Sequence, residues 1–100
     1  MTIYEHRTSL TAASGAVAST TLNIPGGILQ NVLVRANTAT TTFKANLVDG
    51  NSITRLNWGL TACEINDVVT HFPVAGRYTL NITNASPDDT FTVVLSVREN

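Results

Sequence analysis

Charged residues are scarce in this chain, and neither sign of charge dominates. Only 13% of its 100 residues are Asp, Glu, Lys or Arg, and the formal net charge is −1. The six basic residues are scattered along the sequence and never adjacent. Because no basic run or positive field is present to attract nucleic acid or an anionic membrane, we expect neither as a partner.

Cysteine and long apolar stretches are also lacking. Cys63 is the single cysteine, which excludes an internal disulfide, and nothing in the sequence demands an oxidising compartment. The longest apolar runs fall far short of the roughly 20 residues that a membrane-spanning helix needs. The first residues lack a basic start followed by an apolar core, so we expect no secretion signal.

Uncharged polar residues, above all threonine, replace the missing charge. The chain contains 16 threonines, while 43% of its residues are hydrophobic. Threonine suits the exposed face of a strand, because its branched Cβ favours extended backbone and its hydroxyl stays hydrated. The composition predicts a strand-rich body, since disorder requires low hydrophobicity together with high net charge.

Alternation of apolar and polar residues is clearest in the last quarter of the chain. Residues 77–84 and 90–98 carry apolar side chains at every second position, with mostly Thr, Asn, Ser or Arg between them. A period of two is typical of half-buried antiparallel strands. Residues 84–89 supply the turn that joins the two strands.

Six further segments show strand character, so eight strands are expected in all. They are residues 3–9, 16–24, 28–36, 41–48, 52–58 and 68–72, separated by turn signals such as Pro25-Gly26-Gly27 and Asp49-Gly50-Asn51. Thr61 and Glu64 match a capping box, which allows at most one short helical turn near residues 61–69. The sequence therefore predicts an all-β fold, a single antiparallel β-sandwich domain over residues 1–100, in the form of an eight-stranded jelly roll.

The same alternation predicts which side chains form the core. The expected core comprises Leu22, Ile24, Val32, Val34, Phe43, Leu47, Tyr78, Leu80, Ile82, Phe91, Val93, Leu95 and Val97. Other apolar residues, among them Leu33, Val48 and Val94, fall between these positions and so point outward. Outward apolar residues on a chain of low charge suit an assembled protein better than a solitary monomer.

Candidate catalytic and metal-binding residues lack the spacing that their chemistry needs. Cys63, Glu64, Asp67 and His71 lie within nine positions, with His6 as a further candidate, but no pair has the close spacing typical of zinc ligands. No nucleophile stands out beside a base and an orienting group. We therefore expect no metal, no cofactor and no enzymatic activity.

Acidic turn residues and two aromatic residues leave alternatives open. The turns at Asp49-Gly50-Asn51 and Asp88-Asp89 are explained by side chains that bond nearby backbone amides, with calcium binding as the alternative. Trp58 and Tyr4 are candidates for stacking on a sugar ring, although a lone Trp is more often core or interface. Sugar binding predicts two or more aromatic residues on one exposed face, whereas most of the six here occupy core positions.

A likeness to a known family rests on the general pattern and on one motif. The low-charge, signal-free chain with Thr- and Asn-rich strands resembles small bacteriophage capsid decoration, or cement, proteins of the jelly-roll type. The motif is residues 72–80, Phe-Pro-Val-Ala-Gly-Arg-Tyr-Thr-Leu, followed by the last hairpin. This motif also resembles extracellular β-sandwich modules, in which the Pro and Gly set a corner and the Tyr packs beneath it.

The resemblance implies a non-enzymatic virion protein on the outer surface of a capsid, assembled in the host cytoplasm. It further implies contact with the major capsid protein and self-association, with a trimer as the first expectation. No binding residue transfers position by position. From the residues themselves, the expected interface is Leu33, Val48 and the loop Pro25, Gly26 and Gly27. The alternative function is a carbohydrate-binding or adhesive β-sandwich module.

Overall fold

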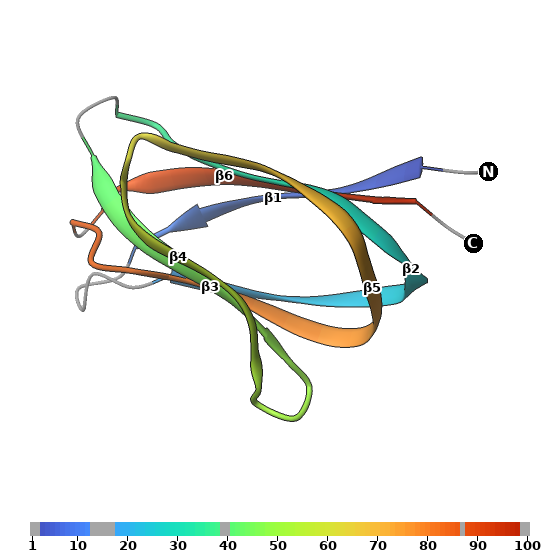
Figure 1. The fold of residues 1–100 in the computed structure, drawn as a ribbon. Helices are drawn as coiled ribbons and strands as arrows, with labels where there is room; N and C mark the ends of the chain where they lie inside the picture. The colour runs from blue at the N-terminus through green and yellow to red at the C-terminus, as the bar shows by residue number, and fades with distance from the viewer. Residues whose placement is uncertain (1–2, 13–17, 39–40, 87, 99–100) are drawn as a thin grey trace.

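Six strands form one antiparallel sheet with the order β1-β6-β2-β5-β3-β4 (Figure 1). The computed structural model describes residues 3–12, 18–38, 41–86 and 88–98, except for the side chains of Tyr4, Pro25 and residues 69–73. The strands are β1 (Ile3–Thr11), β2 (Ala18–Ala36), β3 (Thr42–Asp49), β4 (Thr54–Ala62), β5 (Glu64–Thr83) and β6 (Thr90–Arg98).

Strands β2 and β5 bend near their middle and pair with each other on both sides of the bend. Residues 18–24 of β2 pair with residues 76–82 of β5, and residues 27–35 pair with residues 64–74. Gly26 and Gly76 lie at the bends with φ of 131° and 94°, which glycine adopts at little cost. The Pro25-Gly26-Gly27 segment therefore forms a corner inside a strand, whereas the sequence predicted that it ends one.

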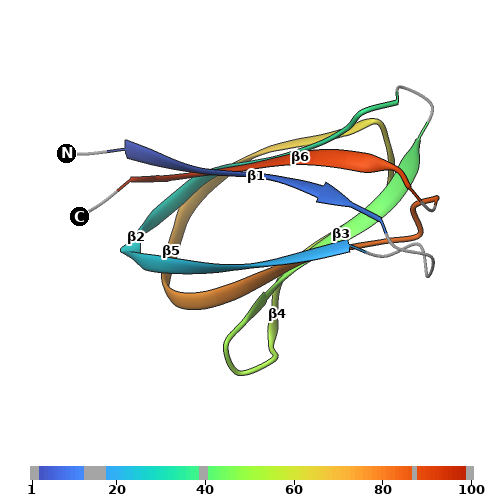
Figure 2. The same cartoon turned by 180° about the vertical axis from the view of Figure 1, so that it is seen from behind.

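The bends fold the sheet into two packed layers, which Figures 1 and 2 show from opposite sides. The terminal layer contains β1, β6, residues 27–36 of β2 and residues 64–74 of β5. The hairpin layer contains residues 18–24 of β2, residues 76–83 of β5, β3 and β4. Counting each half of β2 and β5 separately gives eight strand segments, so the predicted antiparallel β-sandwich with jelly-roll pairing is confirmed.

The ambiguous stretch at residues 61–69 is extended and contains no helical turn. Strand β4 runs to Ala62 and β5 begins at Glu64, so the capping-box pattern is not used. Pairing explains the outcome, because Ile65 lies opposite Val34 of β2 and is buried there. Among the described residues, no helix is long and apolar enough to cross a membrane.

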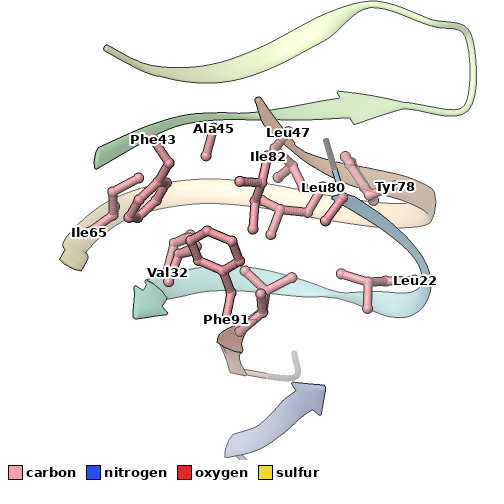
Figure 3. Packing of buried hydrophobic residues seen from close by; sticks show 14 of the residues in the cluster. Leu22, Val32, Phe43, Ala45, Leu47, Ile65, Tyr78, Leu80, Ile82 and Phe91 are labelled. Atoms are coloured by element: carbon pink, nitrogen blue, oxygen red, sulfur yellow. The ribbon is translucent and has the colours of Figure 1, made fainter. Parts of the chain in front are cut away.

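The core lies between the layers, and its predicted composition is confirmed. All thirteen residues expected inside are buried, and Leu29, Ala45, Ile65 and Val74 join them. Phe43 of the hairpin layer and Phe91 of the terminal layer meet edge to face, with ring centroids 5.0 Å apart and an interplanar angle of 69° (Figure 3). This ring contact joins the two layers.

Replacing Phe91 by alanine should lower the free energy of unfolding by about 3–5 kcal/mol, because a fully buried ring leaves a cavity. Urea unfolding followed by Trp58 fluorescence measures the change. The neighbouring substitution Thr92→Ala, on the opposite face of β6, is the control and should cost far less. A loss below about 1 kcal/mol for Phe91→Ala would contradict the packing described here.

Candidate functional site

The residues that the sequence suggested as metal or catalytic candidates are not brought together in one site. Glu64 and Asp67 bond other side chains. Glu64 accepts a 2.7 Å hydrogen bond from Nε of Arg35 on the outer face of the terminal layer. Asp67 accepts a 2.9 Å hydrogen bond from the indole nitrogen of Trp58. The side chain of His71 lies outside the described residues. Among the described residues, no group of three or more His, Cys, Asp or Glu is close enough to hold a metal ion.

Cys63 acts through its backbone, at the junction between β4 and β5. Its N–H donates to the carbonyl oxygen of Thr41 over 2.7 Å, and its own carbonyl accepts from the N–H of Ala36 over 2.7 Å. Its φ of 68° lies in the left-handed region, which costs a non-glycine residue about 1–2 kcal/mol. The thiol is half-buried and free. The two backbone hydrogen bonds and the positive φ therefore account for the role of Cys63 in the fold.

A hydrogen bond between Trp58 of β4 and Asp67 of β5 joins the two layers along one side of the sandwich. Within the described part of the chain, strand β4 pairs only with β3, and residues 64–74 of β5 pair only with β2, so each layer ends in an edge strand here. We call β4, the turn before it and residues 64–74 of β5 the open side. Trp58 is half-buried and packs against the core, so its ring is no exposed platform for a sugar. The side chain of Tyr4, the other aromatic candidate, lies outside the described residues.

Three large exposed apolar side chains occur at separate points along the open side, a feature that sequence reasoning missed. Val68 of β5 is 75% exposed, Leu60 of β4 is 62% exposed, and Ile53 in the turn before β4 is 57% exposed. Ile3 of β1, also 57% exposed, lies on the other edge of the terminal layer. For Val68, the available signal was the ambiguity of residues 61–69, where the sequence allowed a short helical turn.

The interface residues expected from the sequence do not form one patch. Leu33 lies on the outer face of the terminal layer, opposite Val94 and Asn66 of the adjoining strands, and is half-buried. Val48 lies on the outer face of the hairpin layer, opposite Thr79, and is half-buried too. Both point away from the core, as predicted, but on opposite sides of the molecule. Val94 also points outward, yet only 4% of it is exposed.

The corner of β2, at Pro25-Gly26-Gly27, packs closely against the rest of the molecule at Gly27. Gly27 is buried, and a Cβ atom there would overlap the carbonyl oxygen of Arg98. Gly26 is half-buried, with open space where a Cβ would stand. The side chain of Pro25 lies outside the described residues. Position 27 therefore requires glycine because the backbone of β2 lies too close to the backbone of Arg98 for a Cβ atom to fit.

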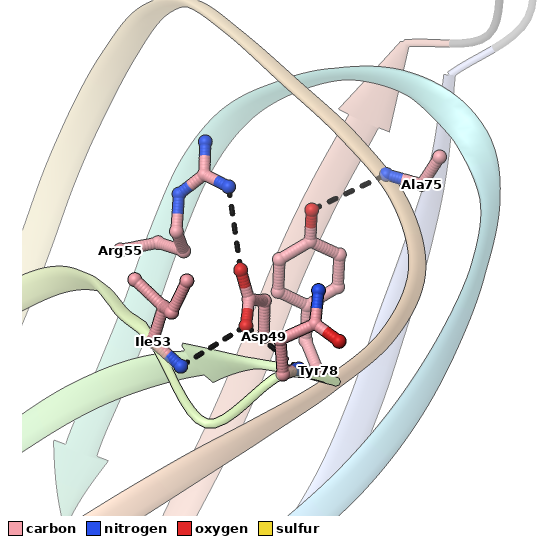
Figure 4. A network of polar contacts seen from close by, with 6 residues as sticks. Asp49, Ile53, Arg55, Ala75 and Tyr78 are labelled. Carbon is pink, nitrogen blue, oxygen red and sulfur yellow. Dashed lines mark hydrogen bonds and ion pairs between the residues drawn. The ribbon is translucent and has the colours of Figure 1, made fainter.

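The motif at residues 72–80 forms the corner that its resemblance implied. Gly76 sits at the bend of β5, and the buried Tyr78 follows it. The hydroxyl oxygen of Tyr78 accepts a 3.3 Å hydrogen bond from the N–H of Ala75 (Figure 4). The tyrosine thus satisfies a backbone donor that the bend removes from the ladder.

Asp49 organises the turn between β3 and β4 (Figure 4). One carboxylate oxygen accepts from the N–H of Asn51 over 2.9 Å and from that of Ile53 over 3.1 Å. The other oxygen lies 3.4 Å from Nη1 of Arg55. The hydrogen bond from Ile53, with help from Asn51 and Arg55, outweighs desolvation and holds the pKa of Asp49 below its ordinary value of 3.8. The residue with positive φ in this turn is Ser52, and Gly50 does not have one.

Neutral polar side chains line up across the outer face of the hairpin layer. Ser19, Asn81, Asn46 and Asn57 lie opposite one another in register on four successive strands. The amide nitrogen of Asn81 donates a 3.0 Å hydrogen bond to the amide oxygen of Asn46. We call these four residues the polar row.

A hollow of about 680 Å³ opens beside the polar row, at the end where β1 stops and β2 begins. It is lined by two apolar residues, Ala18 and Ile82, and by five neutral polar residues, Thr11, Ser19, Asn46, Asn81 and Thr83. A second hollow, at the start of β6 near Asn37, measures about 230 Å³. Only the larger of the two falls within the range of about 300–1,000 Å³ that small-molecule sites occupy.

Comparison with known proteins shows the fold. No protein-family model matches the chain, and no curated protein matches its sequence. The crystal structure of the Drosophila NLP-core, which concerns pentamer formation and histone binding, superposes with a TM-score of 0.56 at 12% sequence identity. The match covers 95% of this chain and 99% of the Drosophila chain, so the two share one overall fold.

Two further solved structures are more distant. A family two carbohydrate esterase from Cellvibrio japonicus matches with a TM-score of 0.40 at 13% identity, over 97% of this chain and 35% of the esterase. The infectious bursal disease virus Gx strain structure matches with a TM-score of 0.37 at 9% identity, over 95% of this chain and 32% of the viral chain. Likenesses this weak indicate nothing about the function of the present chain.

Acid should remove a stabilising contribution that Asp49 makes to the turn. Because the pKa of Asp49 is lowered on folding, the contribution is present above pH 3.8 and is lost as the pH falls through the pKa of the folded state. Asp49→Asn should therefore be less stable than the unmodified protein at neutral pH, and the difference should shrink on acidification. Urea unfolding at a series of pH values measures it.

Arg55→Met is the control for the cause, since it leaves both backbone donors to Asp49 in place. It should keep most of the pH dependence, because the Ile53 hydrogen bond is the largest cause of the shift. Parallel pH profiles for Asp49→Asn and the unmodified protein would contradict this account.

Substitutions at Cys63 should follow backbone geometry. Cys63→Gly should leave the free energy of unfolding unchanged or raise it, because glycine accepts a positive φ without strain. Cys63→Val should lower it by about 1–2 kcal/mol, because a β-branched residue fits that region poorly. Thermal unfolding compares the variants, with Ala62→Val on β4 as the control. Equal stability of the glycine and valine variants would show that the backbone does not govern this site.

Proposed function

We propose that this protein is a non-enzymatic structural protein of a virion. It decorates or cements a bacteriophage capsid by self-association and by contact with the major capsid protein. The resemblance noted from the sequence supports this role, and the jelly-roll fold is consistent with it. The engagement of Glu64 and Asp67 with Arg35 and Trp58 supports the absence of catalysis.

The observation that carries the proposal is the open side. Val68, Leu60 and Ile53 are all more than half exposed there, on or beside edge strands whose outer backbone groups pair with no other described strand. Exposed strand edges flanked by apolar side chains are surfaces that proteins ordinarily cover. Burial of apolar area against a neighbour contributes about 25 cal/mol per Å² before the costs of association. A second copy and the capsid surface are the partners we propose for it.

Low charge supports association as well. A chain with 13% charged residues and a net charge of −1 has little electrostatic repulsion between copies. We expect a trimer first. The Drosophila NLP-core structure concerns pentamer formation, so a pentamer is the second size to consider for this shared fold.

Val68→Glu should weaken self-association by at least about tenfold, because a charge would be buried without a partner at the contact. Sedimentation equilibrium over a range of concentrations measures the association, and circular dichroism checks that the fold persists. Val48→Glu, on the outer face of the hairpin layer among polar neighbours, is the matched control.

Two results separate the possible outcomes. If Val48→Glu weakens association and Val68→Glu does not, the contact lies at Val48, one of the interface residues expected from the sequence, and the open side is not used. If the unmodified protein is a strict monomer at high concentration and binds no capsid lattice, the proposed function fails.

A further inference from the structure

The hollow beside the polar row carries an inference that does not depend on the proposed function. Its five polar lining residues are hydroxyls and amides, and none of its described lining residues carries a charge. A charged ligand would find no opposite charge in this lining. A ligand whose own groups are neutral hydrogen-bond donors and acceptors matches it.

The two asparagines offer both kinds of group to such a ligand. In their mutual hydrogen bond Asn81 uses its nitrogen and Asn46 uses its oxygen. The amide nitrogen of Asn46 therefore remains a donor, and the amide oxygen of Asn81 remains an acceptor. The bond holds both amides in place, so a ligand meets a pre-oriented donor and acceptor pair.

Hydroxyl side chains surround this pair. Ser19 lies opposite Asn81 on β2, Thr83 lies two residues beyond Asn81 on β5, and Thr11 stands at the end of β1. Each hydroxyl can donate and accept, so it can bond an incoming hydroxyl group in either direction.

We infer that this hollow binds a neutral, hydroxyl-rich molecule of the size of one or two sugar rings, held by Asn46, Asn81 and Ser19.

The binding is expected to be weak. Of the described aromatic side chains, none lines the hollow, so the site lacks the stacking contact that adds strength at many sugar sites. Hydrogen bonds exchanged with water give only a small net gain each. An affinity in the millimolar range, on the order of 1–10 mM, follows from these contacts.

A nuclear magnetic resonance titration tests the inference. Methyl β-D-glucopyranoside and methyl α-D-mannopyranoside are the neutral probes, and D-glucuronate is the charged probe. At least one neutral probe should shift the side-chain amide signals of Asn46 and Asn81 in a saturable way. Lys44, exposed on β3 opposite Thr83, is the nearest positive charge on this face by register. Binding of glucuronate alone would attribute recognition to that lysine and overturn the inference.

Variants separate this site from the rest of the face. Asn46→Ala and Asn81→Ala should weaken binding by about fivefold to tenfold, the loss expected for one or two hydrogen bonds. Ser19→Trp should block the hollow while leaving both amides intact. It therefore tests the site independently if the asparagine variants fold poorly. Asn23→Ala, exposed on β2 outside the hollow, is the matched control and should bind as the unmodified protein does.

The inference is overturned if neither neutral probe shifts the two amide signals at about 100 mM, well above the expected dissociation constant. It is equally overturned if Ser19→Trp leaves binding unchanged. Neither result depends on self-association, so it stands apart from the test of the proposed function.

Discussion

The paired bend of β2 and β5 is the constraint on which the rest of the molecule depends. Because the two strands stay paired on both sides of the bend, one sheet becomes two layers, and their pairing is interrupted at the bend only by the irregularity between Ile24 and Gly27. Gly76 supplies the dihedral angles on β5, and Gly27 lets β2 approach Arg98 more closely than a Cβ would allow. The contact between Phe43 and Phe91 exists because the bend brings β3 and β6 face to face.

Most of the fold is predictable from local alternation, and the reason is physical. Successive side chains of a strand point to opposite faces, so residues such as Val32 and Leu80 share the buried face with the other apolar positions of their strands. This holds whatever the strand order. The corner at residues 25–27 was taken for a strand end, since Pro and Gly mark a break without saying whether pairing resumes beyond it. Cys63 shows the same limit, because its positive φ comes from bonds to Ala36 and Thr41, which are distant in sequence.

The candidate surfaces were far less predictable. Leu33 and Val48 were correctly placed outside the core, but their separation onto opposite faces follows from strand order, which one sequence does not contain. Val68 and Leu60 are exposed because their strands lie at the edges of the layers, and an edge is a property of the whole sheet. The hollow likewise depends on register, because Ser19, Asn46 and Asn81 meet only through the pairing of β2, β5 and β3.

The pairing of β1 with β6 has a consequence for how the chain reaches this structure. Ile3 lies opposite Arg98, so a strand from the start of the described chain finds its only ladder partner in the last one. The ends of a long loop must therefore meet before β1 gains any sheet hydrogen bond, and such distant contacts slow folding. During synthesis β1 has no partner until β6 has emerged, and in that interval its edge is open to pairing with another chain.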